Sequence, residues 1–285
     1  MSIRADRNMI VVGVDETPTA MNAARWAAYL ASALRASLLL TYALPHGVTP
    51  AQQLAAHIHS SPQSSDAARA TLDRTRRLVH TCDPELTVSV VRPKGPPAEA
   101  LVALSARARI VVVGARTAFG QRLVGPTTIR VTQHAHCPVG VWRGANGRPI
   151  PHGKPVAVGV DGTELSIPAV AHAFEIAAAL GVPLTAVHCW PSRIEPVGHH
   201  LDRGEEERTL LAEALAGWRT EYPDVEVIEM PVPGLARTVL NEMASDVQLL
   251  VVGSHGHPTA TALLFGSTSR DLLHHTTCPV LVCRS

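Results

Sequence analysis

The chain has 285 residues, a formal net charge of +1, and 46% hydrophobic but only 4% aromatic residues. This length fits two domains of about 140 residues each, and a core poor in aromatic residues is typical of α/β folds. The near-zero net charge argues against a nucleic acid or an anionic membrane surface as the partner. The apolar run Met9 to Val14 is too short for a secretory signal, and the five cysteines form no C-x-x-C pair. We therefore expect a soluble cytoplasmic protein with free thiols and no membrane-spanning segment.

One pattern occurs twice along the chain. Residues 9–17 (MIVVGVDET) resemble residues 155–163 (PVAVGVDGT), and Cys137-Pro138 near the end of the first half corresponds to Cys278-Pro279 near the end of the second. The segment from Arg143 to Lys154 is rich in glycine and proline and is typical of a linker. The sequence therefore predicts two similar domains, 1–144 and 153–285.

Each half alternates short apolar runs with alanine-rich stretches, such as 21–34 and 169–180, that favour helices. Thr17-Pro18 supplies a capping hydroxyl followed by a proline in the first turn of a helix. The predicted strands lie near 9–14, 37–43, 86–91, 109–114 and 138–142 in the first half, and near 155–160, 183–189, 225–230, 248–252 and 279–283 in the second. We expect an α/β fold in which each half is a five-stranded parallel sheet with helices on both faces. The stretch 47–65, rich in Ser, Gln, His and Pro, is expected to be irregular.

A glycine-rich stretch from Leu249 to Ser269 carries the strongest functional signal. An apolar run ends abruptly at Gly253, and Ser267 begins a helical pattern with a hydroxyl available for the N-cap. A strand, a glycine loop and a helix N-terminus form an anion-binding arrangement, because the first-turn N–H groups lack partners and glycine lets a phosphate come close. The stretch matches neither the P-loop nor the Rossmann glycine pattern, so an ordinary turn between strand and helix is the alternative.

The spacing of these glycines resembles that of the universal stress protein family, in the tandem two-domain form of the mycobacterial type. Gly253, Gly256, Gly266 and Ser267 match the family motif G-x2-G-x9-G-[ST] at every fixed position, and the likeness extends over both halves. The resemblance implies a Rossmann-like strand order of 3-2-1-4-5, with ATP bound beyond the ends of strands 1 and 4. The implied binding residues of the second half are Val160, Asp161, Gly162, Thr163, Cys189, Gly253, Gly256, Gly266, Ser267, Thr268 and Ser269.

Two of these residues have separate expected roles. Asp161 is placed to accept hydrogen bonds from the ribose, which we favour, or to reach a Mg²⁺ ion bound with ATP, and helix capping is the alternative. Cys189 ends the second strand, where a backbone amide and carbonyl read the adenine in the family. No metal site is expected from the protein alone, because the histidines and cysteines show no zinc-binding pattern. His255 lies inside the glycine loop and faces either a phosphate or the solvent.

The first half departs from the family motif. Its corresponding residues are Asp15, Ala43, Gly114, Gly125, Thr127 and Thr128, but Thr117 stands in place of Gly256 and Pro126 in place of Ser267, in a loop two residues shorter. Proline removes a backbone donor and the serine hydroxyl. Because each lost bond to a charged oxygen is worth about 1.5–3 kcal/mol, we expect this first site to be poor or empty.

The sequence shows no nucleophile–base pair and no P-loop lysine, so we expect a regulatory nucleotide-binding protein of stress or dormancy with at most slow ATP hydrolysis. A slow ATPase or nucleotidyl-transferring enzyme on the same fold is one alternative, and a nucleotide-free interaction scaffold is another. The family pairs last strands, here 138–142 and 279–283, so we expect an internal pseudo-dimer, with a further homodimer left open.

Overall fold

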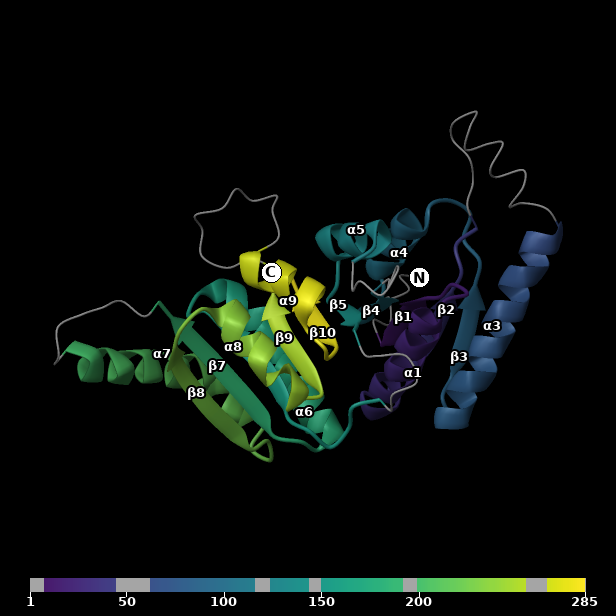
Figure 1. Cartoon of the computed structure of the whole chain (residues 1–285). Helices are drawn as coiled ribbons and strands as arrows, with labels where there is room; N and C mark the ends of the chain where they lie inside the picture. Colours follow the sequence, from purple (N-terminus) through teal and green to yellow (C-terminus); the bar gives the residue numbers. More distant parts are fainter. Residues whose placement is uncertain are drawn as a thin grey trace, which may run out of the picture. The chain divides into compact units, whose positions relative to one another are not determined.

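The computed structural model describes residues 8–44, 62–115, 124–143, 150–191, 199–254 and 266–284, with residues 62–64 and 199–202 described by their backbone (Figure 1). The chain divides into two compact units, Met1–Ile150 and Pro151–Ser285. Each unit is an α/β structure of alternating strands and helices, as the alternation of apolar and alanine-rich stretches predicted.

The first unit contains a parallel sheet in the order β3-β2-β1-β4-β5. Its elements are β1 (Met9–Gly13), α1 (Pro18–Ala33), β2 (Ser37–Thr41), α3 (Pro62–Cys82), β3 (Val88–Val91), α4 (Pro97–Ser105), β4 (Ile110–Gly114), α5 (Pro126–His134) and β5 (Val139–Trp142). Ile10, Val11 and Val12 in the central strand β1 are fully buried. The continuous apolar run of β1 is therefore explained by helices on both faces of the sheet.

The second unit repeats this topology in the order β10-β9-β6-β7-β8. Its elements are β6 (Val156–Val160), η1 (Glu164–Ser166), α6 (Ile167–Leu180), β7 (Leu184–Trp190), α7 (His199–Glu221), β8 (Val227–Pro233), α8 (Ala236–Glu242), η2 (Met243–Ser245), β9 (Leu249–Gly253), α9 (Ser267–His275) and β10 (Val280–Cys283). Both units thus have the predicted strand order 3-2-1-4-5, which confirms the expected fold class.

The strand order reverses direction at the first strand of each unit, and this decides which helices share a face. Right-handed crossovers put α1 and α3 on one face of the first sheet and α4 and α5 on the other. In agreement, α1 packs against α3 and α4 packs against α5, while α6–α7 and α8–α9 pair in the second unit. The carboxyl ends of β1 and β4, or of β6 and β9, therefore form the switch point at which sheets of this kind bind ligands.

Strand β8 runs beyond the predicted 225–230. The N–H of Leu184 donates to the carbonyl of Glu226, and alternate residues of β8 from Glu226 onward therefore face β7. Pro231 and Pro233 fall between them, at positions whose N–H groups would face away from β7. The two prolines thus remove no hydrogen bond from the sheet, and the strand continues through them.

Two local predictions about helix starts are wrong and one is confirmed. The irregular stretch predicted for 47–65 overlaps α3, which begins at Pro62, whereas residues 45–61 lie outside the described part of the chain. Ala68, Leu72 and Val79 are buried and form one apolar stripe along α3. Burial of this stripe favours the helix, and Pro62 can begin it because proline is tolerated in the first turn.

The predicted side-chain cap at the start of α9 is absent, because Gly266 occupies the N-cap and makes no side-chain bond. Thr17 does cap α1 as predicted. Its Oγ1 accepts a hydrogen bond from the N–H of Ala20 at 3.2 Å, and Pro18 follows in the first helical position. A hydroxyl residue caps only when it stands one residue before the helix, and Ser267 stands inside it.

Candidate functional site

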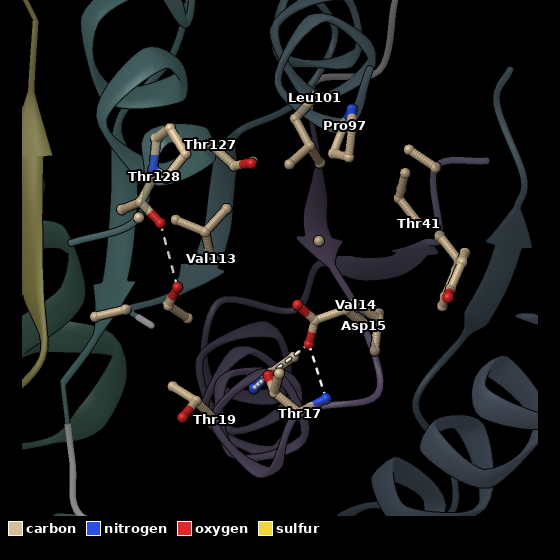
Figure 2. A pocket seen from close by; sticks show the side chains of 18 of the residues that line it. Val14, Asp15, Thr17, Thr19, Thr41, Pro97, Leu101, Val113, Thr127 and Thr128 are labelled. Carbon is tan, nitrogen blue, oxygen red and sulfur yellow. Dashed lines mark hydrogen bonds between the residues drawn. The ribbon is translucent and has the colours of Figure 1, made fainter. Parts of the chain in front are cut away.

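A pocket of about 320 Å³ lies at the carboxyl ends of β1, β2 and β4 in the first unit (Figure 2). This volume is at the lower end of the range for small-molecule sites, about 300–1,000 Å³. All six residues that the sequence assigned to this half line the pocket: Asp15, Ala43, Gly114, Gly125, Thr127 and Thr128. The topology brings them together from four separate segments, because β1 is hydrogen-bonded to β2 on one side and to β4 on the other.

The carboxylate of Asp15 has one oxygen committed to the protein and one available. Its Oδ1 accepts from the backbone N–H of Thr17 at 2.9 Å and from the hydroxyl of the same residue. No hydrogen bond to its other oxygen is formed by the residues that the structure describes. Figure 2 shows that second oxygen turned toward the space between Val113 and Leu101. Asp15 therefore shapes the turn before α1 and still presents an acceptor to the pocket.

The backbone of Ala43 faces the pocket without a partner. In β2, the N–H of Tyr42 bonds to Val91 on the β3 side, while the carbonyl of Thr41 accepts from Val14 on the β1 side. Alternation turns the N–H and C=O of Ala43 to the β1 side, where β1 has already ended. Within the described part of the chain neither group is hydrogen-bonded. One donor and one acceptor are therefore left for a ligand.

The N-terminus of α5 closes the pocket from the opposite side. Pro126 occupies the first helical position, so the N–H groups of Thr127 and Thr128 are the unpaired donors of the first turn. The Thr128 hydroxyl donates to the carbonyl of Gly114 at 3.2 Å and fixes the helix end against β4. A Cβ on Gly114 would lie 3.1 Å from the backbone of Thr19, so α1 approaches this glycine closely and a side chain there would force Thr19 to shift. Thr128 thus positions the helix, and its hydroxyl is not free for a ligand.

The pocket also has walls that the sequence reading missed. Pro97 and Leu101 of α4, Val113 of β4 and Thr17 of the first loop contribute side chains to its lining. A Cβ on Gly13 would lie 2.9 Å from Leu101 Cδ1, which shows how closely α4 covers the end of β1. The sequence carried a weak signal for the position of α4. Gly95 and Gly234 occupy corresponding places in the repeat, just before α4 and α8.

In the second unit the first loop is built in the same way. Asp161 Oδ1 accepts from the N–H and the hydroxyl of Thr163, at 2.9 Å and 2.7 Å. Thr163 then caps η1 through the N–H of Leu165. The other carboxylate oxygen of Asp161 has no partner among the described residues. One oxygen of Asp161 therefore orders the turn before η1, and the second remains available as an acceptor.

The ends of the glycine loop are tied together in the second unit. The N–H of Gly266 donates to the carbonyl of Ser254 at 2.9 Å, and the Ser269 hydroxyl donates to the carbonyl of Gly266 at 3.0 Å. Gly266 and Ser269 are both among the predicted binding residues, and here the N–H of the first and the hydroxyl of the second are bonded within the protein. The first-turn N–H groups of Ser267, Thr268 and Ser269 remain as donors. Gly256 and His255 lie outside the described residues.

Two neighbouring residues lie at the carboxyl end of β7, beside the end of β6. Cys189 is half-buried, and desolvation by burial raises the pKa of its thiol to about 11, so the thiol is neutral and unreactive near pH 7. His188 is 5% exposed and contacts both Val160 and Glu207. The contact between His188 and Glu207 was not predicted from the sequence, because the two residues belong to different elements.

The described residues contain no group of three or more His, Cys, Asp or Glu side chains arranged to hold a metal ion. They also contain no helix with the length and apolar character needed to cross a membrane.

Comparison with known proteins gives consistent matches. A model of the universal stress protein family matches residues 7–143 and again residues 153–284. A universal stress protein of Mycolicibacterium smegmatis is 36% identical over 285 residues, covering 96% of each chain. Another, of Mycobacterium tuberculosis, is 33% identical over 294 residues, covering 100% of this chain and 99% of its own.

A solved structure shows the same fold. The crystal structure of a universal stress protein from Archaeoglobus fulgidus has a TM-score of 0.70 at 17% identity, covering 98% of this chain and 99% of its own. The family model matches nearly the whole length, and two relatives are 36% and 33% identical, so together they show which family the chain belongs to. The chain belongs to the universal stress protein family and carries the domain of that family twice.

Proposed function

We propose that this chain binds an adenine nucleotide, ATP, as a regulatory ligand, with the stronger site in the second unit. The observation that carries the proposal is the arrangement around the pocket of the first unit. There a carboxylate oxygen, an unpaired backbone donor–acceptor pair and a helix N-terminus converge beyond the carboxyl ends of three parallel strands. The second unit repeats the carboxylate and the helix N-terminus.

Each of these groups suits one part of the nucleotide. The second oxygen of Asp15 or Asp161 is an acceptor for ribose hydroxyls. The N–H and C=O of Ala43 match the donor–acceptor edge of adenine, and residue Cys189 holds the corresponding place in the second unit. The unpaired N–H groups at the start of α5 or α9, at the positive end of the helix dipole, suit phosphate oxygens.

The first helical turn favours the second unit. Ser267 contributes a backbone N–H and an exposed hydroxyl at a position where Pro126 has neither. The first unit can still hold the nucleoside part of the ligand, because it keeps the available oxygen of Asp15 and the unpaired backbone groups of Ala43. We therefore expect one strong and one weak site in each chain.

Magnesium fits this site only as a companion of the phosphates. A single carboxylate with one free oxygen gives Mg²⁺ too few protein ligands. In nucleotide sites Mg²⁺ usually keeps several waters and is coordinated mainly by phosphate oxygens. When bound with ATP, the ion would neutralise phosphate charge. Asp161 is the described residue of the second unit that could approach it.

Titration calorimetry with ATP on the full chain tests the proposal. We expect a stoichiometry near one, with a second and much weaker event when the ligand is in large excess. Two sites of matched affinity would contradict the assignment to the second unit. Mass spectrometry of denatured protein for co-purified nucleotide separates a nucleotide-binding protein from a nucleotide-free scaffold.

A specific alternative, slow ATP hydrolysis, is separated from simple binding by phosphate release over time. The Asp161→Asn variant provides the matched control, because loss of release together with loss of binding assigns the activity to this site. Release that is unchanged in the variant would come from elsewhere.

A further inference from the structure

His188 joins three elements of the second unit. It lies at the carboxyl end of β7, one residue before Cys189, and only 5% of its surface is exposed. Its Nδ1 lies 2.8 Å from the carbonyl oxygen of Val160, and its Nε2 lies 2.8 Å from Oε2 of Glu207 on α7. The carbonyl of Val160 belongs to the peptide unit that also contains the N–H of Asp161. The imidazole therefore connects the long helix α7 to the first residue of the candidate nucleotide loop.

Both partners of His188 are hydrogen-bond acceptors. A neutral imidazole has one N–H and can satisfy only one of them, whereas an imidazolium has two and satisfies both. Arg203 Nε lies 3.5 Å from the other oxygen of Glu207, so the Glu207 carboxylate is held between Arg203 and His188. The geometry thus fits a buried imidazolium between a carbonyl and a carboxylate, with charge-assisted bonds of the stronger kind.

Helix α7 also touches the same loop at a second point. Gly162 has a φ of +77°, and a Cβ there would lie 2.7 Å from Leu210 Cδ2. Glu207 and Leu210 are three residues apart and share one face of α7. The face that holds His188 therefore also supports the turn that carries Asp161.

We propose that His188 is a positioning residue whose imidazolium, clamped between Val160 and Glu207, couples α7 to the Asp161 loop and makes nucleotide affinity in the second unit depend on pH. The coupling rests on the proposed function, but the clamp itself does not. The first unit has Tyr42 at the corresponding position, because Gly13 pairs with Thr41 as Gly159 pairs with Val187. A pH-dependent clamp of this kind is therefore expected in the second unit and not in the first.

The direction of the pH effect follows from the proton count. The clamped arrangement holds one more proton than a neutral imidazole beside an ionised carboxylate, so a rise in pH opens it and a fall in pH closes it. On α7, Glu207 contacts the ring and Arg203 contacts Glu207, and the loop after β6 adds Asp161, whose Oδ1 accepts from Thr163. Strand β8 presents the uncharged Pro231 opposite His188.

The clamp can be observed directly in the nucleotide-free chain. We expect the proton NMR spectrum of the folded protein at mildly acidic pH to contain two slowly exchanging imidazole N–H signals that disappear in His188→Gln. In Glu207→Gln only the Nδ1–H signal remains, because the new amide donates to a neutral Nε2. A wild-type spectrum with a single such signal overturns the clamp.

The same pair of variants tests the coupling to the nucleotide. As the pH rises across the range in which the chain stays folded, we expect ATP affinity of the wild type to fall about tenfold more than that of Glu207→Gln, in which both bonds survive without the extra proton. His172→Gln, which removes the partly exposed His172–Glu175 pair on α6, is the matched control and keeps the wild-type profile. Because ATP titrates in the same way with every variant, comparing each variant with the wild type also corrects for the titration of ATP itself.

Two outcomes separate the parts of the proposal. Identical pH profiles in wild type and Glu207→Gln overturn the coupling, whatever the affinity. Absence of ATP binding at every pH refutes the nucleotide function and the coupling together, while two protected N–H signals would still establish the clamp. If His188→Gln does not fold, Glu207→Gln carries both tests, because it keeps the size and hydrogen bonds of the native side chain.

Discussion

The ends of β2 and β7 correspond in the two units but carry different residues. In the first unit Tyr42 lines the pocket, and burial raises the pKa of its hydroxyl, with the charges of Glu16 and Asp15 acting in the same direction. Tyr42 therefore stays neutral. In the second unit His188 occupies the corresponding place. Its imidazole, a titratable group, contacts Val160 and Glu207.

A second difference lies at the first turn of the last helix. Gly125 precedes Pro126 with φ −70° and ψ 158°, and Gly266 precedes Ser267 with φ −56° and ψ 144°. Both conformations are of the extended kind that a following proline requires. The two backbones are thus nearly interchangeable, and the number of donors offered to a ligand is set by the side chain and the amide of a single residue. The units differ in chemistry more than in shape.

The largest effect is expected from exchanging this residue between the units. Ser267→Pro removes an N–H and a hydroxyl without disturbing the helix, since proline is favoured at the first helical position. With each bond to a charged oxygen worth about 1.5–3 kcal/mol, ATP affinity of the second unit should fall about 10²- to 10⁴-fold. Calorimetry measures the affinity, and an unchanged melting temperature without ATP confirms that the fold is intact.

The reciprocal change, Pro126→Ser, is the matched control. It should strengthen the weak event assigned to the first unit and leave the strong one unaltered. If Ser267→Pro binds ATP as tightly as the wild type, the first turn of α9 does not hold the phosphates.

The next effect concerns the carboxylates. Asp161→Asn keeps an oxygen that can accept from Thr163 but removes the negative charge offered to the ribose. One charge-assisted bond is worth about 1.5–3 kcal/mol, so ATP and adenosine should both bind about 10- to 150-fold more weakly. Asp15→Asn should change only the weak site.

The role of the metal is decided by the same variant. Weakening of ATP alone, and only in the presence of Mg²⁺, would assign Asp161 to the ion. Equal affinities in wild type and variant, with and without Mg²⁺, would leave the turn to Thr163 as its role.

A smaller effect, on stability, is expected at the glycine under α7. Gly162→Ala forces a side chain into the left-handed region and against Leu210, which together should reduce the free energy of unfolding by about 2–4 kcal/mol. Gly181 has a φ of +63° with no atom within 4 Å of its Cβ position, so Gly181→Ala should lose only the conformational part, about 1–2 kcal/mol. Urea titration measures both, and equal losses would show that Leu210 moves aside freely.

The smallest effect is expected at the end of β7. Cys189→Ala introduces the residue found at position 43 of the first unit, and in the proposed site adenine contacts only the backbone there. ATP affinity should therefore stay within about twofold, which lies inside 0.5 kcal/mol. A tenfold loss would show that the neutral thiol itself contacts the ligand.

Much of the fold could be predicted because its determinants are local. Apolar runs such as Leu249 to Val252 are continuous when a strand is buried on both faces, and the repeat of residues 9–17 at 155–163 revealed two units. Thr17-Pro18 marked a helix start correctly, since a cap and its helix are neighbours in sequence. The start of α3 at Pro62 was missed because Ser and Gln composition resembles that of a loop, whereas burial of one helix face decides the outcome.

By itself, then, the sequence determined the repeat, the α/β alternation, the glycine motif and through them the family. Tertiary structure alone decided which polar groups of the site are already used by the protein: Gly266 N–H by Ser254, and one oxygen each of Asp15 and Asp161 by a threonine. It also decided that His188 meets Glu207, 19 residues away in the chain. A motif specifies which groups are near a ligand, but hydrogen bonds between separate elements arise only when crossovers bring those elements together, and so they leave no pattern in the sequence.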